Sequence, residues 1–193
     1  KMLKDDPRLF IGGGIIRAHI GQEKPNDIDV FGPSEAILEA TAKNLNTARS
    51  AKGEQSRVHK TKNATTVFCG VRLPVQFITR WTYTDPIAVA KSFDFTVCQA
   101  VIFYDPIQSS FDSYCADEFY SDLAARRLSY TSPARTEDAG GSLLRVVKYV
   151  RRGYSIQVQS LGAVCARFYS GIRSDSKAVY DESERALVLT GLL

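Results

Sequence analysis

The sequence predicts an α/β (α+β) fold, in which a mixed β-sheet is flanked by helices and followed by a small helical C-terminal part. Strand-like segments are concentrated before residue 105, and the clearest helical pattern comes after residue 140. Within 71–79, residues alternate, with Val75 and Phe77 on one face and Gln76 and Ile78 on the other. Strands that come first and helices that come last suggest a mixed sheet with a helical C-terminal part.

The first half of the chain supplies most of the expected sheet. Gly32-Pro33-Ser34 ends one strand and caps the next helix, because serine is a preferred N-cap residue. That helix carries an apolar stripe that includes Ile37 and Leu38. The elements expected in this half are strands at 9–11, 27–31, 57–59, 65–69 and 71–79, with helices at 15–20 and 34–48.

The second half is expected to turn from strand to helix. Asp85-Pro86 is a cap followed by a proline, which is a favourable start for a short helix. The elements expected here are a helix at 85–91, a central strand at 95–104, a helix at 115–126, a short strand at 128–130, a helix at 142–152 and two or three helices in 160–193. We divide the chain into a head domain at 1–135 and a helical C-terminal extension at 136–193.

Composition places the chain among ordinary globular proteins. Hydrophobic residues make up 44% and charged residues 24%, and the net charge is +4 with a pI near 8.9. This charge permits a polyanionic partner without requiring one. Four widely spaced cysteines, no secretory segment and no long apolar run favour reduced thiols in a soluble cytoplasmic protein with no membrane partner. The chain begins and ends abruptly, as a fragment of a longer polypeptide would.

A glycine run that precedes two aspartates is the most informative feature. Gly12, Gly13 and Gly14 come shortly before Asp27 and Asp29. Residues two apart on a strand point to the same face, so the two carboxylates can hold Mg²⁺, or Mn²⁺ in its place, with phosphates completing the shell. Glycines let a backbone approach a triphosphate closely. The alternatives are a simple turn and a solvated strand end, and the run matches neither a P-loop nor a dinucleotide fingerprint.

These residues resemble the opening motif of the DNA polymerase β-like nucleotidyltransferases, nearest the tRNA CCA-adding enzymes and bacterial poly(A) polymerases. The first motif reads Gly13-Gly14-Ile15-Ile16-Arg17, then Gly21, Pro25 and Asp27-Ile28-Asp29. Three later segments are similar to the family's second, third and fourth motifs. The second corresponds to Asp94-Phe95-Thr96-Val97 with Phe103-Tyr104-Asp105-Pro106, and the third to Asp122-Leu123 with Arg127-Leu128. The fourth corresponds to Glu137-Asp138 with Leu143-Leu144-Arg145 and Lys148-Tyr149. The resemblance implies a nucleotidyltransferase-type sheet, an NTP substrate and an acceptor that is an RNA 3′ end, a protein or a small molecule.

The resemblance also implies roles for single residues. Catalytic and metal-binding roles fall on Asp27, Asp29 and Asp94, and nucleotide binding falls on Gly13, Gly14, Arg17, Asp138, Arg145 and Lys148. Asp94 has the alternative of a strand-end or helix-capping carboxylate, and Arg17 that of a surface ion pair. In the helix at 142–152, Arg145, Lys148 and Arg152 share one face. This face either forms a positively charged wall over a nucleotide or a nucleic-acid strand, or is simply a solvated charged face. We expect Leu143, Val147, Val150 and Tyr154 to face the core.

Three departures separate the chain from CCA-adding enzymes. No arginine lies three residues after Glu137-Asp138, Gln76 occupies another strand position where a carboxylate could lie, and Ser92-Phe93 replaces arginines. The base-selecting template is therefore not intact, and we expect a divergent nucleotidyltransferase. The main alternative is a catalytically inactive relative that binds nucleotide, RNA or a partner, and a third is a toxin-like nucleotidyltransferase.

Overall fold

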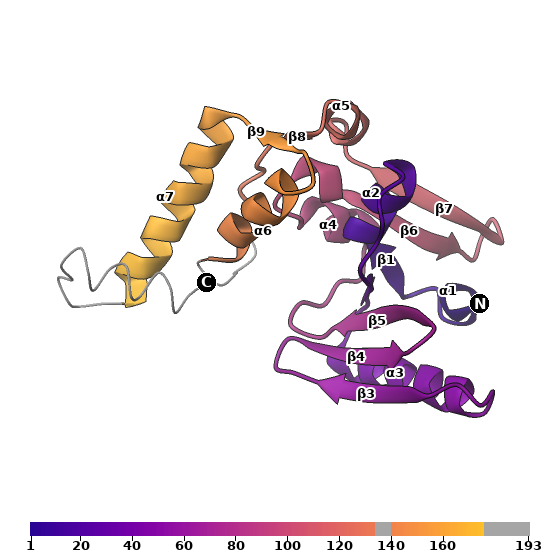
Figure 1. The fold of residues 1–193 in the computed structure, drawn as a ribbon. Coiled ribbons are helices and arrows are strands. Elements are labelled where there is room, and N and C mark those ends of the chain that lie inside the picture. The colour runs from indigo at the N-terminus through magenta and orange to yellow at the C-terminus, as the bar shows by residue number, and fades with distance from the viewer. Residues whose placement is uncertain (134–139, 176–193) are drawn as a thin grey trace.

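The computed structural model describes residues 1–133 and 140–175, with side chains as far as residue 170 (Figure 1). Its centre is a mixed sheet with the strand order β3-β4-β5-β2-β1-β6-β7. The strands are β1 Phe10–Gly12, β2 Ile28–Phe31, β3 Ser56–Lys60, β4 Ala64–Cys69, β5 Arg72–Ile78, β6 Ala100–Asp105 and β7 Ser110–Cys115. The pairing of β2 with β5 is parallel and the other pairings in this sheet are antiparallel. The predicted mixed α/β fold is confirmed.

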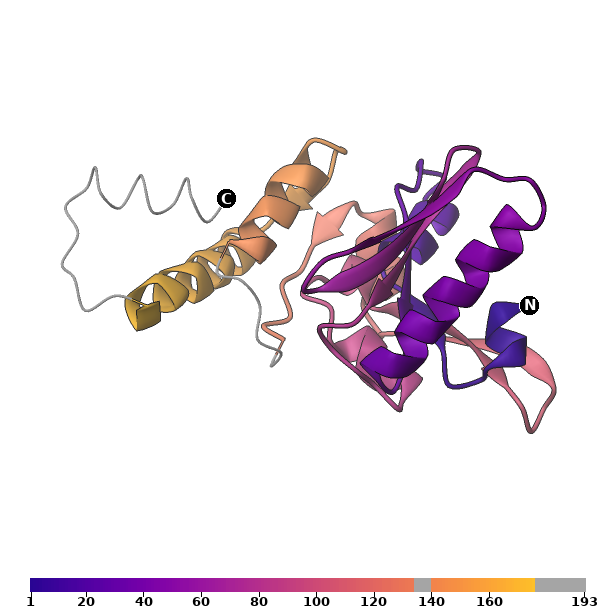
Figure 2. The same cartoon turned by 90° about the horizontal axis from the view of Figure 1, so that it is seen from below.

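Helices cover the sheet on both faces. They are α1 Met2–Asp5, α2 Gly14–Ile20, α3 Glu35–Ser50, α4 Pro86–Lys91 and α5 Phe119–Ala124, with a 3-10 turn at Thr96–Cys98. Figure 2 shows α3 lying across β3, β4 and β5. Leu38 and Ala42 of α3 are fully buried there against Val67 and Phe77 of the sheet. On the opposite face α4 packs over β1 and β6.

Both predicted helix caps are present. The Ser34 hydroxyl accepts a hydrogen bond from the Ile37 amide at 3.3 Å, so it satisfies one of the free donors at the start of α3. The Asp85 carboxylate accepts from the amides of Ile87 and Ala88 at 3.1 and 3.0 Å, with Pro86 in the first turn of α4. These local signals fixed the two helix starts.

The C-terminal part contains α6 Gly141–Val150, the short strand β9 Ser155–Ile156 and α7 Val158–Asp175, and β9 pairs in parallel with β8 Arg127–Leu128 of the head. The two helices lie side by side at the edge of the molecule (Figure 1). A hydrophobic cluster joins both helices to the head. In it, Val146 and Tyr149 of α6 and Val164 of α7 pack with Phe95 and Phe119 of the head. The predicted boundary between 135 and 136 lies outside the described residues and stays a prediction.

Two element predictions were wrong. The segment 95–104 is not one strand, because the 3-10 turn interrupts it before β6 begins. The helix expected at 115–126 begins only at Phe119, and the residues before it form β7, which pairs with β6 across a hairpin. Strand β7 is an edge strand with mostly exposed residues, so its sequence lacks the apolar pattern that marks a buried strand.

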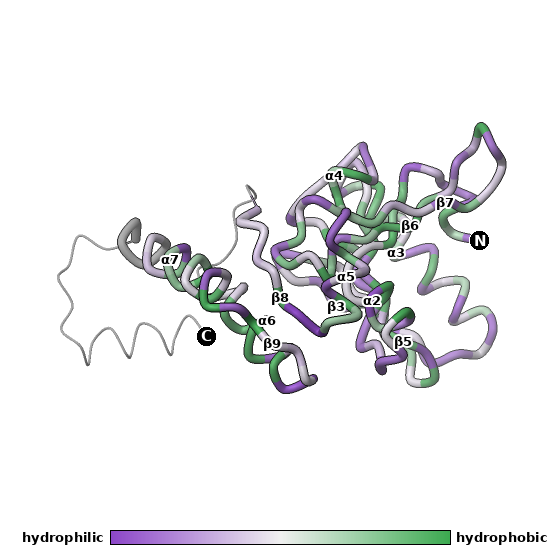
Figure 3. The backbone as a smooth tube through the Cα atoms, turned by 90° about the horizontal axis from the view of Figure 1, so that it is seen from above, coloured by the Kyte–Doolittle hydropathy of each residue, from purple (hydrophilic) through white to green (hydrophobic). Residues whose placement is uncertain are grey.

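The orientation of α6 differs in part from the prediction: Tyr154 is buried and Leu143 packs against the core as expected, whereas the two valines are not buried. Val147 and Val150 are 43% and 49% exposed, whereas Val146 and Tyr149 are buried. Helix α6 therefore has hydrophobic residues both on its buried side and on its exposed side. Figure 3 shows green hydrophobic positions along this helix, with purple hydrophilic positions between them. Polar ties from this helix to the head, described below, fix its rotation, because a pattern with apolar residues on two faces does not define one core face.

Candidate active site

One pocket contains most of the site residues that the sequence predicts. Its volume is about 610 Å³ when the part that opens to solvent is included. The lining residues come from α2, from β2 and the loop before it, from the segment between α4 and β6, and from α6 and the turn after it. They are Gly14, Arg17, Asn26, Asp27, Asp29, Phe93, Asp94, Cys98, Arg145, Lys148, Tyr149 and Arg152.

The two aspartates lie together, as their spacing predicts. Asp29 is on β2, and its Cα partners are Gly12 on β1 and Gln76 on β5. Asp27 immediately precedes the strand, and both carboxylates are half-buried in the wall of the pocket. Their predicted placement in one solvent-open pocket is confirmed, while their role in catalysis stays a prediction.

Gly13 and Gly14 serve different purposes. Gly13 has φ +76°, and a Cβ built on it would lie 2.9 Å from the Phe93 ring. Both facts exclude larger residues at this position, so Gly13 is explained by the packing of Phe93 and does not itself line the pocket. Gly14 does line it, and the atom nearest to its ideal Cβ is the Arg17 Nη2 at 4.0 Å. The backbone at Gly14 is therefore the part of the glycine run that a phosphate can approach.

Asp94 reaches the pocket but is already engaged. It is 1% exposed, and its Oδ2 accepts from the Arg145 Nη1 at 2.5 Å and from the Ser142 hydroxyl at 2.8 Å. Among residues 1–133 and 140–175, no three His, Cys, Asp or Glu side chains are placed to share a metal ion. The metal-binding role expected for Asp94 beside Asp27 and Asp29 stays a prediction, and in this structure its carboxylate holds α6 against the head.

Arg17 is buried rather than open to a phosphate. Its side chain is 2% exposed, and its Nη1 donates to the Glu23 Oε2 at 2.5 Å and to the Tyr154 hydroxyl at 3.4 Å. Its guanidinium also lies 4.8 Å from the centre of the Tyr149 ring. Burial by itself lowers the pKa of Arg17, but Tyr149, Cys98, Tyr154 and Glu23 raise that pKa above its usual value, so the group stays charged. This geometry explains Arg17 as a structural cation, and its predicted phosphate contact remains untested.

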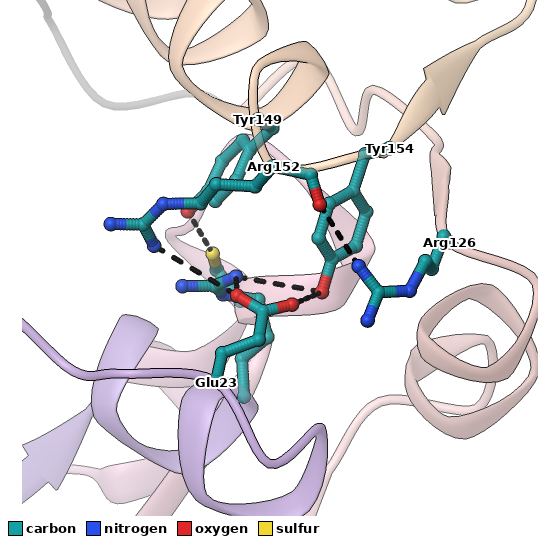
Figure 4. A network of polar contacts seen from close by, with 7 residues as sticks. Glu23, Arg126, Tyr149, Arg152 and Tyr154 are labelled. Atoms are coloured by element: carbon teal, nitrogen blue, oxygen red, sulfur yellow. Dashed lines mark hydrogen bonds and ion pairs between the residues drawn. The ribbon is translucent and has the colours of Figure 1, made fainter.

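A polar network around Glu23 ties the head to the C-terminal part (Figure 4). The Tyr154 hydroxyl donates to the Glu23 Oε1 at 2.7 Å, and the Arg152 Nη1 lies 3.9 Å from the Glu23 Oε2. The Arg126 Nη1 donates to the Arg152 carbonyl at 2.9 Å. The sequence did not reveal that Glu23, Tyr149 and Tyr154 surround Arg17, because contacts between residues more than 120 positions apart leave no local pattern.

A buried thiol and phenol lie beside this network. The Cys98 Sγ and the Tyr149 hydroxyl are 2.8 Å apart. Burial is the main cause that raises the pKa of the Cys98 thiol, and burial likewise raises the pKa of the Tyr149 phenol well above its usual range. Both groups are therefore neutral at pH 7.

The basic residues of α6 and of the turn that follows it border the pocket, as predicted. Arg145, Lys148 and Arg152 all line it. Lys148 is exposed, Arg145 is held by Asp94, and Arg152 is half-buried near Glu23. Lys148 is thus the cation best placed to meet an incoming anion. The predicted nucleotide contact at Asp138 lies outside the described residues.

A protein-family model described as "Gad2: Gabija anti-defense 2 family protein" matches residues 1–126. The chain belongs to the Gabija anti-defense 2 family. The match covers the whole sheet and the carboxylate pair. A search of curated proteins gives no match.

Solved structures show which fold this Gabija anti-defense 2 protein has. The Thermotoga maritima CCA-adding enzyme complexed with tRNA is similar with a TM-score of 0.58 at 15% identity, over 91% of this chain and 43% of that one. A tRNA-processing enzyme (apo form I) gives 0.58 at 17%, covering 81% and 41%. A tRNA nucleotidyltransferase complexed with a primer tRNA and an incoming ATP analog gives 0.55 at 16%, covering 88% and 49%. The chain spans less than half the length of these three structures, and the likeness establishes a nucleotidyltransferase-like fold.

The site of this family member suits a metal ion that shares its shell with a substrate. Asp27 and Asp29 supply two hard oxygen donors, and Mg²⁺ is often bound by one or two carboxylates plus phosphates. The residue beside Asp29 on β5 is Gln76, which carries no charge. The donor set therefore fits Mg²⁺ with a triphosphate better than a site made from protein ligands alone.

In the described part of the chain no helix is long and apolar enough to cross a membrane.

Proposed function

We propose that this Gabija anti-defense 2 protein is a Mg²⁺-dependent nucleotidyltransferase. It would transfer a nucleoside monophosphate from an NTP to an acceptor hydroxyl and release pyrophosphate. The observation that carries the proposal is the meeting of Asp27, Asp29 and Gly14 in one pocket, within a nucleotidyltransferase-like fold. These groups supply the oxygen ligands and the open backbone that a metal-bound triphosphate requires.

Each part of the pocket has a task in this proposal. Asp27 and Asp29 would hold Mg²⁺, or Mn²⁺ in its place, and the bound ion would activate the acceptor hydroxyl and neutralise the leaving pyrophosphate. Gly14 leaves space for phosphate oxygens, and Lys148 opposes their charge. Asp94 positions Arg145 at the rim through the ion pair. Gly13 leaves room for the Phe93 ring, and the buried Arg17–Glu23 ion pair stabilises the region next to the pocket.

The partners follow from the fold and from the family. The similar structures include complexes with tRNA and with an ATP analog, so an NTP and an RNA end are the first substrates to test. A protein hydroxyl and a small molecule are the other acceptor classes. The family name refers to Gabija defence, and we propose that the transferred nucleotide is the means by which this protein acts against it.

Incubation with each of four α-³²P-labelled NTPs, Mg²⁺ and a cell lysate tests this function. Label should enter one acceptor class with one or two preferred NTPs, and EDTA should abolish the transfer. Asp27→Asn and Asp29→Asn should also abolish it. Asp112→Asn, which changes an exposed carboxylate on β7 of the same sheet, is the matched control and should transfer normally.

A catalytically inactive relative that binds nucleotide or RNA is the second candidate. The neutral Gln76 beside Asp29 and the engaged Asp94 favour it, since the metal site then rests on two carboxylates. Thermal melting separates the two candidates. An NTP that raises the melting temperature without any transfer of label supports the inactive relative, whereas transfer supports the enzyme.

A further inference from the structure

The sheet has a second surface that the pocket does not use. Helix α3 covers one face of β3, β4 and β5, where Val67, Val75 and Phe77 are buried. Successive side chains on a strand point to opposite faces. Thr66, Phe68 and Gln76 therefore point to the face away from α3. This is the same face that carries Asp29, because Asp29 is the Cα partner of Gln76. We call the part formed by β5, β4 and β3 the open sheet face; Gln76 and Phe68 are partly exposed on it, whereas Thr66 between them is 5% exposed.

The pairing register of the strands places a row of side chains across this face, beginning at Asp29. Gln76 pairs with Asp29, Thr66 pairs with Gln76, and His59 pairs with Thr66. At about 4.8 Å between neighbouring strands, His59 lies roughly 14 Å from Asp29. The pair formed by Arg57 and Phe68 comes two positions further along the same strands and so lies on the same face. The row thus leads from the carboxylate pair to the edge of the sheet.

The outer end of this row has an aromatic and cationic character. The Arg57 guanidinium lies 5.3 Å from the centre of the Phe68 ring, and a shallow cavity there is lined by Arg57, Val58, His59 and Phe68. Arg57 and His59 are exposed, and no carboxylate in the described ranges forms an ion pair with Arg57. An aromatic ring beside uncompensated positive charge suits a nucleobase with its phosphate.

The geometry of phosphoryl transfer indicates what this face is for, and this step rests on the proposed function. The attacking oxygen and the leaving pyrophosphate must lie roughly in line, on opposite sides of the α-phosphorus. The pocket that would hold the triphosphate is lined from β2 towards α2 and α6, and none of its described lining residues comes from β3, β4 or β5. The open sheet face, which meets the pocket at Asp29, is therefore a surface along which an acceptor can approach from the side away from the triphosphate.

We propose that the open sheet face is a platform for the 3′-terminal region of a single-stranded nucleic-acid acceptor. One base would stack on Phe68, with Arg57 and His59 beside its phosphates, and the strand would run past Gln76 to the carboxylate pair. The terminal hydroxyl oxygen forms the new bond to the α-phosphorus, the bond from that phosphorus to pyrophosphate breaks, and the hydroxyl proton passes to solvent. The acceptor is then a nucleic acid rather than a protein side chain.

Binding of fluorescein-labelled 12-nucleotide RNA and DNA strands without NTP tests the platform by anisotropy. Because stacking on an aromatic ring contributes about 1–3 kcal/mol per base, Phe68→Leu should weaken binding at least about fivefold. Arg57→Gln should weaken it and lower its salt dependence. Phe111→Leu is the matched control, since Phe111 is a 56% exposed phenylalanine on β7 of the same sheet, and it should bind as the wild type does. Circular dichroism and melting verify that each variant is folded.

The outcomes separate the platform from the proposed function. Equal affinity of wild type and Phe68→Leu for every strand overturns the platform. Transfer of label to a lysate protein, with no binding of single strands, also overturns it while the nucleotidyltransferase activity stands. Strand binding that depends on Phe68, without any transfer of label, keeps the platform and removes the enzyme. Dependence on Phe68 in both binding and transfer supports both.

Discussion

Removal of the Glu23 charge tests whether Arg17 is a structural cation. In Glu23→Gln the shape of the side chain is retained, but the buried Arg17 guanidinium loses its ion-pair partner. Arg17 is 2% exposed and Glu23 is 13% exposed, so this pair is among the most buried in the described part of the chain. Breaking a buried pair from one side costs about 3–5 kcal/mol, because an uncompensated charge is left in the interior.

The structure points to the lower end of that range. Water reaches the Glu23 side of the pair, and glutamine can still accept a hydrogen bond from Arg17. We expect a loss of about 3 kcal/mol in the free energy of unfolding. For a chain of this size that corresponds to a fall of about 6–12 °C in melting temperature.

Urea denaturation of four proteins provides the assay: wild type, Arg17→Met, Glu23→Gln and the double variant. The double variant should lose at least about 1 kcal/mol less than the sum of the single losses, because the residues are in direct contact. Glu54→Gln is the control, because the arginine of the Glu54–Arg72 pair is 54% exposed and the loss of this pair should change stability much less than Glu23→Gln does.

A loss below about 1 kcal/mol for Glu23→Gln would refute the structural account of Arg17. If Arg17 instead binds phosphate, removal of the competing carboxylate should raise nucleotide affinity and leave stability nearly unchanged. Titration of each variant with an NTP and Mg²⁺ by thermal shift distinguishes these results. An affinity gain without a loss of stability would restore Arg17 to the nucleotide site.

Three further results are expected. Gly13→Ala should lower the melting temperature, because its methyl would meet a phenylalanine ring at 2.9 Å in a left-handed backbone, whereas Gly14→Ala should fold normally and lose the thermal shift given by Mg²⁺ with an NTP. Asp94→Asn should cost about 2 kcal/mol in urea denaturation by weakening the tie to Arg145, and should keep that thermal shift; loss of the shift would return Asp94 to the metal site. Burial raises the folded-state pKa of Cys98 above the ordinary value of 9.0, so stability present below pH 9 should fall as the pH rises past 9, and Cys98→Ala should flatten this fall in urea midpoints measured from pH 7 to 10.5.

Local sequence signals determined much of the head domain. The alternation in 71–79 and the caps at Ser34 and Asp85 depend on neighbouring residues, so the strand and the two helix starts were predictable. The spacing of Asp27 and Asp29 likewise predicted that they lie in one pocket, and both line it although Asp27 comes just before the strand.

Tertiary structure decided which charges are available for chemistry. Asp94 is drawn to Arg145 across 51 positions, and Arg17 is enclosed by Glu23 and Tyr154. Such partners come together only when the sheet and α6 have packed. A charged side chain that the sequence assigns to ligand binding can therefore form an ion pair inside the protein instead. The rotation of α6 has the same origin. Its apolar residues lie on two faces, and the ties at its buried side select which face meets the core.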